Sequence, residues 1–235
     1  MSGIPIKASS VPVGDDILLS AFRQIAALGP SGIALVHAEN ADIITRTRAR
    51  IGQLKPKGNL VDWADCHTNV AEEEAVLRSV YLAEQAGCRI YIVHVSSAEA
   101  LQRLRALRKE NLALNVETCS PYLTLTKYSK DGLLAKLIPP LRGKEDLESL
   151  WLGVKEDVVD SLGTDNIFRT RSYKQPEKGL IGARGAATFL GVHLPVMLDE
   201  GIHRRNLPLE KLIDKMTRQP ARIFGLYPKK GTIAP

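Results

Sequence analysis

The chain has 235 residues, of which 44% are hydrophobic and 25% are charged, as in ordinary globular proteins. No apolar run approaches the roughly 18 residues of a membrane span, and the N-terminus lacks a signal-peptide core. We therefore expect a cytoplasmic protein that does not bind a membrane, and its three cysteines without close pairing fit reduced thiols there. The net charge is +6, but aromatic residues are only 5% and are not interleaved with the basic ones, which argues against nucleic-acid binding.

Strand and helix patterns alternate from the N-terminus onward. The first strand candidate covers residues 4–8, and a helix with apolar residues at helical spacing follows over 18–28, where a Gly-Pro pair stops it. The second strand candidate covers 33–40. A polar stretch at 46–68 comes next, and because it is long for a simple connection we expect it to lie over the site.

The same alternation continues to the C-terminus. Asn69 with Glu72 predicts a capping box that opens a helix running to Gly87. Strand candidates at 90–97 and 112–117 are separated by another helix. Further along we expect a Pro-Pro-Leu-Arg loop at 139–142, a helix over 147–158, a strand-like turn at 161–165 and a last helix over 209–218 closed by Pro220.

This alternation indicates a parallel α/β sheet with right-handed crossovers. Five units of this kind can form an open doubly wound sheet or part of an eight-stranded barrel, whose usual size is about 250 residues. No Gly-rich phosphate loop follows the first strand, which argues against a nucleotide-binding sheet. The five strand candidates end near Lys7, His37, His94, Glu117 and Asp165.

Two histidines stand at strand ends in matched contexts. His37 and His94 each follow a run of apolar residues and are each followed by polar ones. Parallel sheets place catalytic groups at the carboxyl ends of their strands. Together with the strand-end carboxylate of Asp165, two imidazoles suit Zn²⁺ or a similar divalent ion, and the carboxylate can also carry a proton to a leaving nitrogen.

Other candidate residues remain open on spacing alone. For Lys7 the spacing favours a surface or salt-bridged lysine, although carboxylation by CO₂ would give a carbamate that can bridge two metal ions. Arg142 follows two prolines in a rigid loop, and it fits structural pairing and substrate anchoring equally well. His67 is predicted to be a surface-loop residue, and His193 and His203 have no ligand-like partners at useful spacing.

Five short motifs lie at or near the expected strand ends. They are Val36–Asn40 (VHAEN), Ile92–Ser97 (IVHVSS), Glu117–Cys119 (ETC), Pro139–Arg142 (PPLR) and Gly163–Asp165 (GTD). Their order resembles that of the cyclic amidohydrolases, the family that includes dihydroorotase, allantoinase, dihydropyrimidinase and hydantoinase. The segment 220–234 is similar to the closing segment of the same family.

The resemblance implies a TIM-type (β/α)₈ barrel of the metal-dependent hydrolase type. Residues 1–235 would be a single portion of it, about strands four to eight. The implied activity is the opening of a small cyclic amide or imide by a metal-bound hydroxide, with Zn²⁺, Mn²⁺ or another divalent ion in a binuclear site of a homo-oligomeric full-length protein. Residue by residue, Lys7 resembles the carboxylated bridging ligand, His37 and His94 resemble ligands of one ion, and Asp165 resembles the ligand of the other ion and the proton shuttle.

The chain departs from the family pattern at several points. The first-strand His-x-His pair and the small β-sandwich domain have no counterpart, so we expect an N- and C-terminally truncated, incomplete barrel. Asn166 replaces a common histidine, and Ser120-Pro121 stands where Pro-His is frequent. Arg142 and Asn166 are the candidate substrate-binding residues. The lack of a tyrosine shortly after Lys7 and the presence of Ile138 where a serine is usual argue against the hydantoinase and dihydropyrimidinase branch. The arginine that contacts substrate in dihydroorotases normally follows the missing His-x-His pair, so the substrate branch stays undetermined.

Two functions from different classes follow. The first is the metal-dependent hydrolase, and the alternative is a non-catalytic relative that serves as an assembly module, or an inactive fragment; Asn166 and Ser120-Pro121 motivate that alternative. Closure of a barrel ties strand number to tilt and stagger, so five strands cannot close one of eight. We therefore expect the chain to need further strands or a neighbouring chain.

Overall fold

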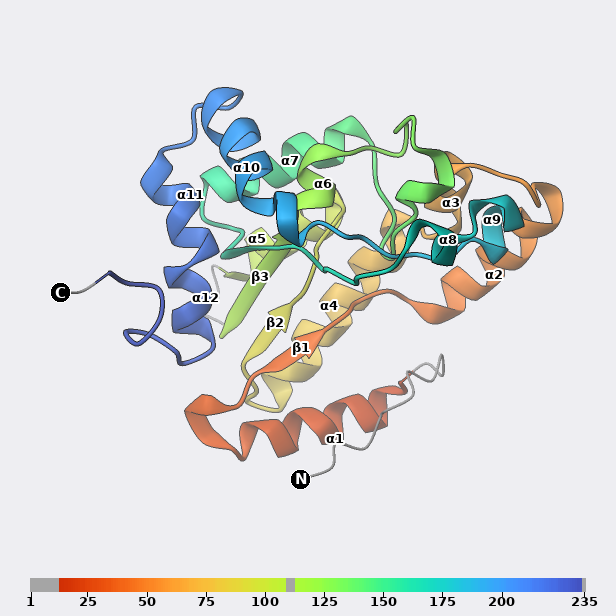
Figure 1. Ribbon diagram of the computed structural model, residues 1–235. Helices are drawn as coiled ribbons and strands as arrows, with labels where there is room; N and C mark the ends of the chain where they lie inside the picture. The colour runs from red at the N-terminus through yellow and green to blue at the C-terminus, as the bar shows by residue number, and fades with distance from the viewer. Residues whose placement is uncertain (1–12, 109–112, 234–235) are drawn as a thin grey trace.

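A computed structural model describes residues 13–108 and 113–233 of the chain. The strand candidate at 4–8, with Lys7, lies outside the described residues. Within them, one parallel sheet has its strands in sequential order, as in the wall of a barrel (Figure 1). A doubly wound sheet would reverse its strand order at a switch point, so the order favours the barrel alternative. The strands are β1 (Ala34–Val36), β2 (Ile90–Ile92), β3 (Leu114–Cys119) and β4 (Ser161–Gly163).

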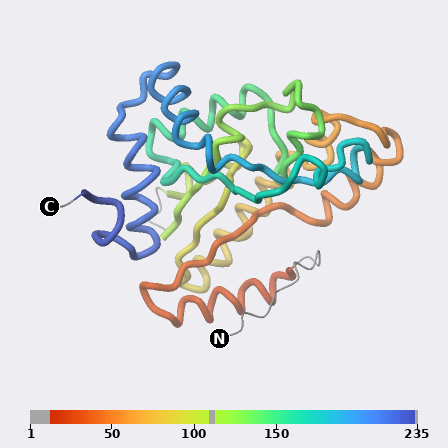
Figure 2. The backbone as a smooth tube through the Cα atoms, in the orientation of Figure 1, coloured from red at the N-terminus to blue at the C-terminus, as the bar shows by residue number. Residues whose placement is uncertain are grey.

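A long helix precedes each strand and returns the chain to the start of that strand: α1 before β1, α4 before β2, α5 before β3 and α7 before β4. These helices pack side by side, α1 on α4, α4 on α5 and α5 on α7, and the path of the backbone is clear in Figure 2. The main core lies between them and the sheet, where Ile90 and Ile92 of β2 are buried. Their bounds are α1 (Asp15–Ala26), α4 (Asn69–Gln85), α5 (Ala98–Arg108) and α7 (Lys144–Lys155).

The opposite face of the sheet changes from exposed to buried along the strand order. The parallel register places Leu35 of β1 beside Tyr91 of β2, so their side chains share this face. Tyr91 is 1% exposed, whereas Leu35 is 56% exposed. Glu117 and Ser161 continue the same face on β3 and β4. Among the described residues, this face is therefore covered at β2 and open at β1.

The polar stretch at 46–68 folds differently from the prediction. It forms most of two helices, α2 (Ala41–Leu54) and α3 (Leu60–Cys66), in place of a connection without regular structure. Asn40 and Asn59 begin these helices by accepting hydrogen bonds from backbone N–H groups of the first turns. The two buried isoleucines of α2 are too far apart for the apolar pattern to stand out in the sequence.

Two helix boundaries also differ from expectation. Thr68, and not Asn69, caps α4, because its hydroxyl accepts the N–H of Ala71 while Glu72 turns away to contact Ser96. Pro220 does not close the last helix. It lies in the first turn of a further helix, where proline is tolerated because that N–H has no helical partner. The two C-terminal helices are α11 (Leu209–Met216) and α12 (Arg218–Ile223).

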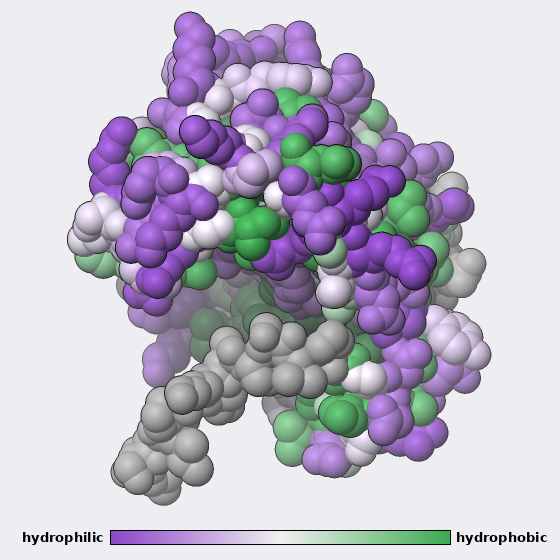
Figure 3. All heavy atoms as spheres, turned by 90° about the vertical axis from the view of Figure 1, so that its right-hand side faces the viewer, coloured by the Kyte–Doolittle hydropathy of each residue, from purple (hydrophilic) through white to green (hydrophobic). Residues whose placement is uncertain are grey.

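The segment between β4 and α11 is built from short pieces. In Figure 1 its teal part crosses in front of the strands, and α9 contacts α2. Figure 3 shows a mostly hydrophilic face, with hydrophobic side chains in small groups and inside a hollow near the middle. Among the described ranges, no helix is both long and apolar enough to span a bilayer. The short elements are α6 (Ser120–Thr124), α8 (Arg171–Lys174), α9 (Gly179–Gly182), α10 (His193–Met197) and a π-helical turn at Leu198–His203.

Candidate functional site

The two predicted histidines meet at the carboxyl end of the sheet. Strands β1 and β2 are adjacent, and their register pairs Val36 with Ile92, so the residues that follow them leave the sheet together. Nδ1 of His37 lies 3.0 Å from Nε2 of His94. The rings meet edge to face, with centroids 4.8 Å apart and planes at 73°.

This spacing fits two ligands of one metal ion. Zinc binds imidazole nitrogens at about 2.0–2.1 Å, so two such nitrogens on one ion lie about 3–3.4 Å apart. Nδ1 of His94 is buried without a hydrogen-bond partner in the described part of the chain, so Nε2 is the nitrogen of that ring that meets another polar group. Within residues 13–108 and 113–233, no three His, Cys, Asp or Glu side chains come close enough to hold a metal. The described residues thus supply two imidazoles of the predicted site.

The two imidazoles lie in different electrostatic environments. Burial would lower the pKa of His37, but the hydrogen bond and the negative charge of Glu39 outweigh it and raise that pKa above its ordinary value. His94 is 7% exposed, and burial together with the charge of His37 lowers its pKa to about 3. His94 is therefore neutral at physiological pH, as a metal ligand must be.

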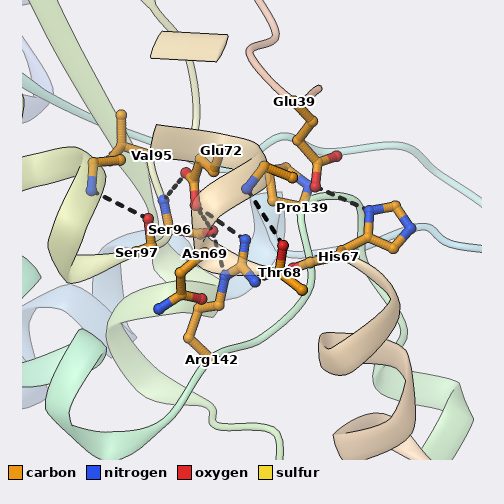
Figure 4. A network of polar contacts seen from close by, with 12 residues as sticks. Glu39, His67, Thr68, Asn69, Glu72, Val95, Ser96, Ser97, Pro139 and Arg142 are labelled. Atoms are coloured by element: carbon orange, nitrogen blue, oxygen red, sulfur yellow. Dashed lines mark hydrogen bonds and ion pairs between the residues drawn. The ribbon is translucent and has the colours of Figure 1, made fainter. Parts of the chain in front are cut away.

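Glu39 links His37 to a third histidine, His67, which the sequence did not reveal as part of the site. Nε2 of His37 lies 3.1 Å from Oε2 of Glu39, and Nδ1 of His67 lies 2.9 Å from Oε1 (Figure 4). Burial would raise the pKa of Glu39, but hydrogen bonds from both histidines lower it to about 2. The surface-loop prediction for His67 is wrong: it is 2% exposed, and its ring lies 4.3 Å from that of Trp63.

Arg142 lies in a buried ion-pair network next to His67. Its Nη2 donates to Oε2 of Glu72 at 3.1 Å, its Nε donates to Oγ of Ser96 at 3.0 Å, and its Nη1 donates to the carbonyl of His67. The N–H of Ser96 donates to the other oxygen of Glu72 at 2.7 Å (Figure 4). Of the two alternatives for Arg142, the described contacts are those of structural pairing, while substrate contact stays a prediction.

Asp165 lies beyond β4 in a conformation that L-residues rarely adopt. Its φ is 46°, and that of His94 is 43°. Such backbones cost free energy and gather at functional sites. Burial raises the pKa of Asp165, and the positive charge of His37 opposes this. The carboxylate makes no hydrogen bond within the described ranges, whereas the side-chain oxygen of Asn166 accepts the N–H groups of Phe189 and Leu190 at 3.0 and 3.1 Å.

Glu117 supports the sheet beneath the histidines. Its Oε2 accepts the hydroxyl of Tyr91 at 2.7 Å and its Oε1 accepts the N–H of His94 at 3.3 Å. Burial raises the pKa of this carboxyl group. A Cβ at Gly163 would come within 2.7 Å of it, so the carboxyl needs a glycine at that position of β4.

The comparisons with known proteins agree with this architecture. The model of the amidohydrolase family matches residues 11–235. An L-hydantoinase of Paenarthrobacter aurescens is 32% identical over 96% of the chain and 50% of its own length, and an allantoinase of Rubrobacter xylanophilus is 36% identical over 92% and 48%. The solved structure of the L-hydantoinase from Arthrobacter aurescens has a TM-score of 0.90 at 31% identity, over 97% of this chain and 51% of that one.

The fold is that of an amidohydrolase α/β barrel with a parallel sheet, covered in part. The chain belongs to the amidohydrolase family, and it spans about half the length of the relatives it matches. These relatives are cyclic amide hydrolases, and hydantoinases and allantoinases match it at comparable identity. The family prediction from the five motifs is confirmed.

Proposed function

We propose that this chain carries part of the metal site of a cyclic amidohydrolase. The observation that carries the proposal is the 3.0 Å contact between Nδ1 of His37 and Nε2 of His94 at the ends of adjacent parallel strands. In the proposal these two imidazoles hold one divalent ion, Zn²⁺ or alternatively Mn²⁺. Asp165 and a carboxylated Lys7 complete a binuclear site in the whole protein.

The proposed reaction is hydrolysis of a ring C–N bond. A bound divalent ion would supply a hydroxide nucleophile at neutral pH and polarise the ring carbonyl. The carboxylate of Asp165 accepts the proton of the attacking water and delivers it to the ring nitrogen as the C–N bond breaks. Its left-handed backbone just beyond β4 and its lack of hydrogen bonds within the described residues support this role.

The proposed substrate is a five- or six-membered ring with an amide or imide bond, opened to an N-carbamoyl acid or a similar product. The names of the matched hydantoinase and allantoinase support this class. We propose Asn166 as a ring contact, because its oxygen is fixed by two backbone N–H groups beside Asp165. For Arg142 we propose a supporting role, since its side chain is 3% exposed as part of a buried network.

We further propose that the chain is a single barrel portion, about strands four to eight, without the small β-sandwich of the family. Further strands or another chain would then cover the open face at β1 and add the remaining metal ligands. The 56% exposure of Leu35, on the face that Tyr91 buries in β2, supports this arrangement. Assembly of the whole protein into homo-oligomers remains part of the proposal.

Zinc binding by equilibrium dialysis tests the proposal. We expect measurable binding that His94→Ala weakens at least tenfold, and the exposed His203 provides the matched control His203→Ala, which should leave binding unchanged. Hydantoin, allantoin, dihydrouracil and dihydroorotate would be assayed in parallel with added Zn²⁺ or Mn²⁺. A chain that melts cooperatively but binds no metal would contradict the hydrolase and favour the assembly module.

A further inference from the structure

Glu39 faces a different histidine with each of its carboxylate oxygens. Oε2 meets Nε2 of His37 at 3.1 Å, and Oε1 meets Nδ1 of His67 at 2.9 Å. Its side chain is 3% exposed, as is that of His67, so the contact between these two residues is shielded from water, whereas the side chain of His37 is 45% exposed. An ionised carboxylate only accepts hydrogen bonds, and each facing nitrogen must therefore carry its hydrogen.

The consequence for His37 is a fixed tautomer. With the hydrogen on Nε2, Nδ1 of the neutral ring keeps its lone pair. That lone pair lies on the side of the ring that meets Nε2 of His94 at 3.0 Å. The ring is oriented as well, because its two nitrogens meet partners from opposite directions.

His67 in turn holds Glu39 from the protein interior. Its ring packs on Trp63, and its carbonyl accepts a hydrogen bond from the buried Arg142. Nε2 of His67 is buried without a partner in the described part of the chain. A buried polar atom without a hydrogen bond costs about 1–3 kcal/mol, so packing alone does not explain a histidine here. The contact of its Nδ1 with Glu39 does.

We propose that Glu39, held in place by His67, is a positioning residue that fixes His37 as the Nε2–H tautomer with its Nδ1 lone pair directed at the metal position. Neither residue touches substrate in this scheme, and both act through His37. The effect on metal affinity rests on the proposed metal site, whereas the tautomer of His37 does not depend on it. Partners that orient a ligating histidine typically change metal affinity 10–100-fold when they are removed.

The test reads the tautomer and the metal affinity separately. Two-bond ¹H–¹⁵N correlation spectra of the metal-free protein, recorded well above the raised pKa of His37 so that its ring is neutral, show which nitrogen carries the hydrogen. We expect Nε2–H in the native chain and a mixture of tautomers in Glu39→Ala. Zinc affinity, measured by competition with a chromophoric chelator, should fall 10–100-fold in Glu39→Ala and remain unchanged in the control Glu84→Gln, at an exposed glutamate.

Two substitutions of His67 separate positioning from packing. His67→Phe keeps a ring on Trp63 but removes the donor, and should reproduce both effects of Glu39→Ala. His67→Asn restores a donor at the place of Nδ1 and should rescue the tautomer and the affinity. These two variants also test the positioning role if Glu39→Ala fails to fold.

The outcomes distinguish this inference from the proposed function. A native His37 with its hydrogen on Nδ1, or Glu39→Ala and His67→Phe chains that keep both the tautomer and the affinity, would overturn the positioning role even if zinc binds. A tautomer that changes as expected in a chain without measurable zinc binding would support the positioning role and contradict the metal site.

Discussion

The histidine side of the candidate site, at the ends of β1 and β2, is supported by buried carboxylates. Glu39 holds the ring of His37, and Glu72 pairs with Arg142 beneath it. The aspartate side consists of Asp165 and the segment 166–189. This segment is held by the buried ammonium group of Lys136 instead of a carboxylate. Nζ of Lys136 donates to the carbonyls of Leu180 and Ala183 at 2.6 Å each and lies 3.7 Å above the ring of Trp63.

The two kinds of support orient different parts of the site. A carboxylate that accepts an imidazole N–H orients a side chain, so the histidine side presents nitrogens in a fixed direction. An ammonium that donates to carbonyls orients backbone, so Lys136 fixes the path of a loop. The carboxylate of Asp165 itself makes no hydrogen bond within the described residues, as suits a group that must exchange a proton.

The largest expected effect is loss of the buried pair on the histidine side. Arg142→Ala leaves Glu72 buried and uncompensated, and we expect the free energy of unfolding to fall by about 3–5 kcal/mol in urea denaturation. The matched control is Arg103→Ala, because Arg103 pairs with Glu73 at a side-chain exposure of 57%. Such surface pairs contribute about 0–1 kcal/mol. Equal losses of unfolding free energy in the two variants would contradict the stabilising role of the buried Arg142–Glu72 pair.

On the aspartate side, stability should change with pH through Lys136. Burial, helped by the charge of Arg48, lowers the pKa of Lys136 to about 8, against about 10.4 in an unfolded chain. The folded chain thus releases this proton first, and stability rises with pH between these two values. From pH 7 to about 9.5, the native chain should gain roughly 2 kcal/mol relative to Lys136→Met. If the unfolding free energies of the two proteins changed with pH in the same way, the lowered pKa of Lys136 would be refuted.

The smallest expected effect is on stability at Asp165 itself. Glycine relieves the left-handed backbone by about 1 kcal/mol but loses about 0.5–1 kcal/mol more entropy on folding, so Asp165→Gly should stay within about 1 kcal/mol of the native chain. Asp165→Val should lose about 1–2 kcal/mol. Thermal melts of both variants measure this. A loss above 2 kcal/mol in Asp165→Gly would show that the carboxylate has a structural partner.

The sequence predicted those parts of the molecule that depend on local pattern. Apolar runs ending in His37 and His94 placed two histidines on neighbouring parallel strands, and the five motifs indicated the family. Asp165 was recognised by the same signal, a polar residue at a strand end. These predictions needed only strand ends and their order.

What the sequence did not reveal depends on contacts between distant residues. His67 and Glu39 are 28 positions apart, and they meet only once the intervening helices α2 and α3 have folded. The one local signal was the spacing of Glu39 two residues after His37 in the VHAEN motif. Similarly, Glu72 was assigned to a capping box because its partner Ser96 lies 24 positions away.

A crystal of the chain grown with Zn²⁺ and measured at the zinc absorption edge tests the central claim most directly. The account predicts an anomalous peak within about 2.0–2.1 Å of both Nδ1 of His37 and Nε2 of His94. The peak should disappear in His94→Ala and persist in His203→Ala. Zinc found only elsewhere on the chain, with the two nitrogens still in direct contact at 3.0 Å, would contradict it.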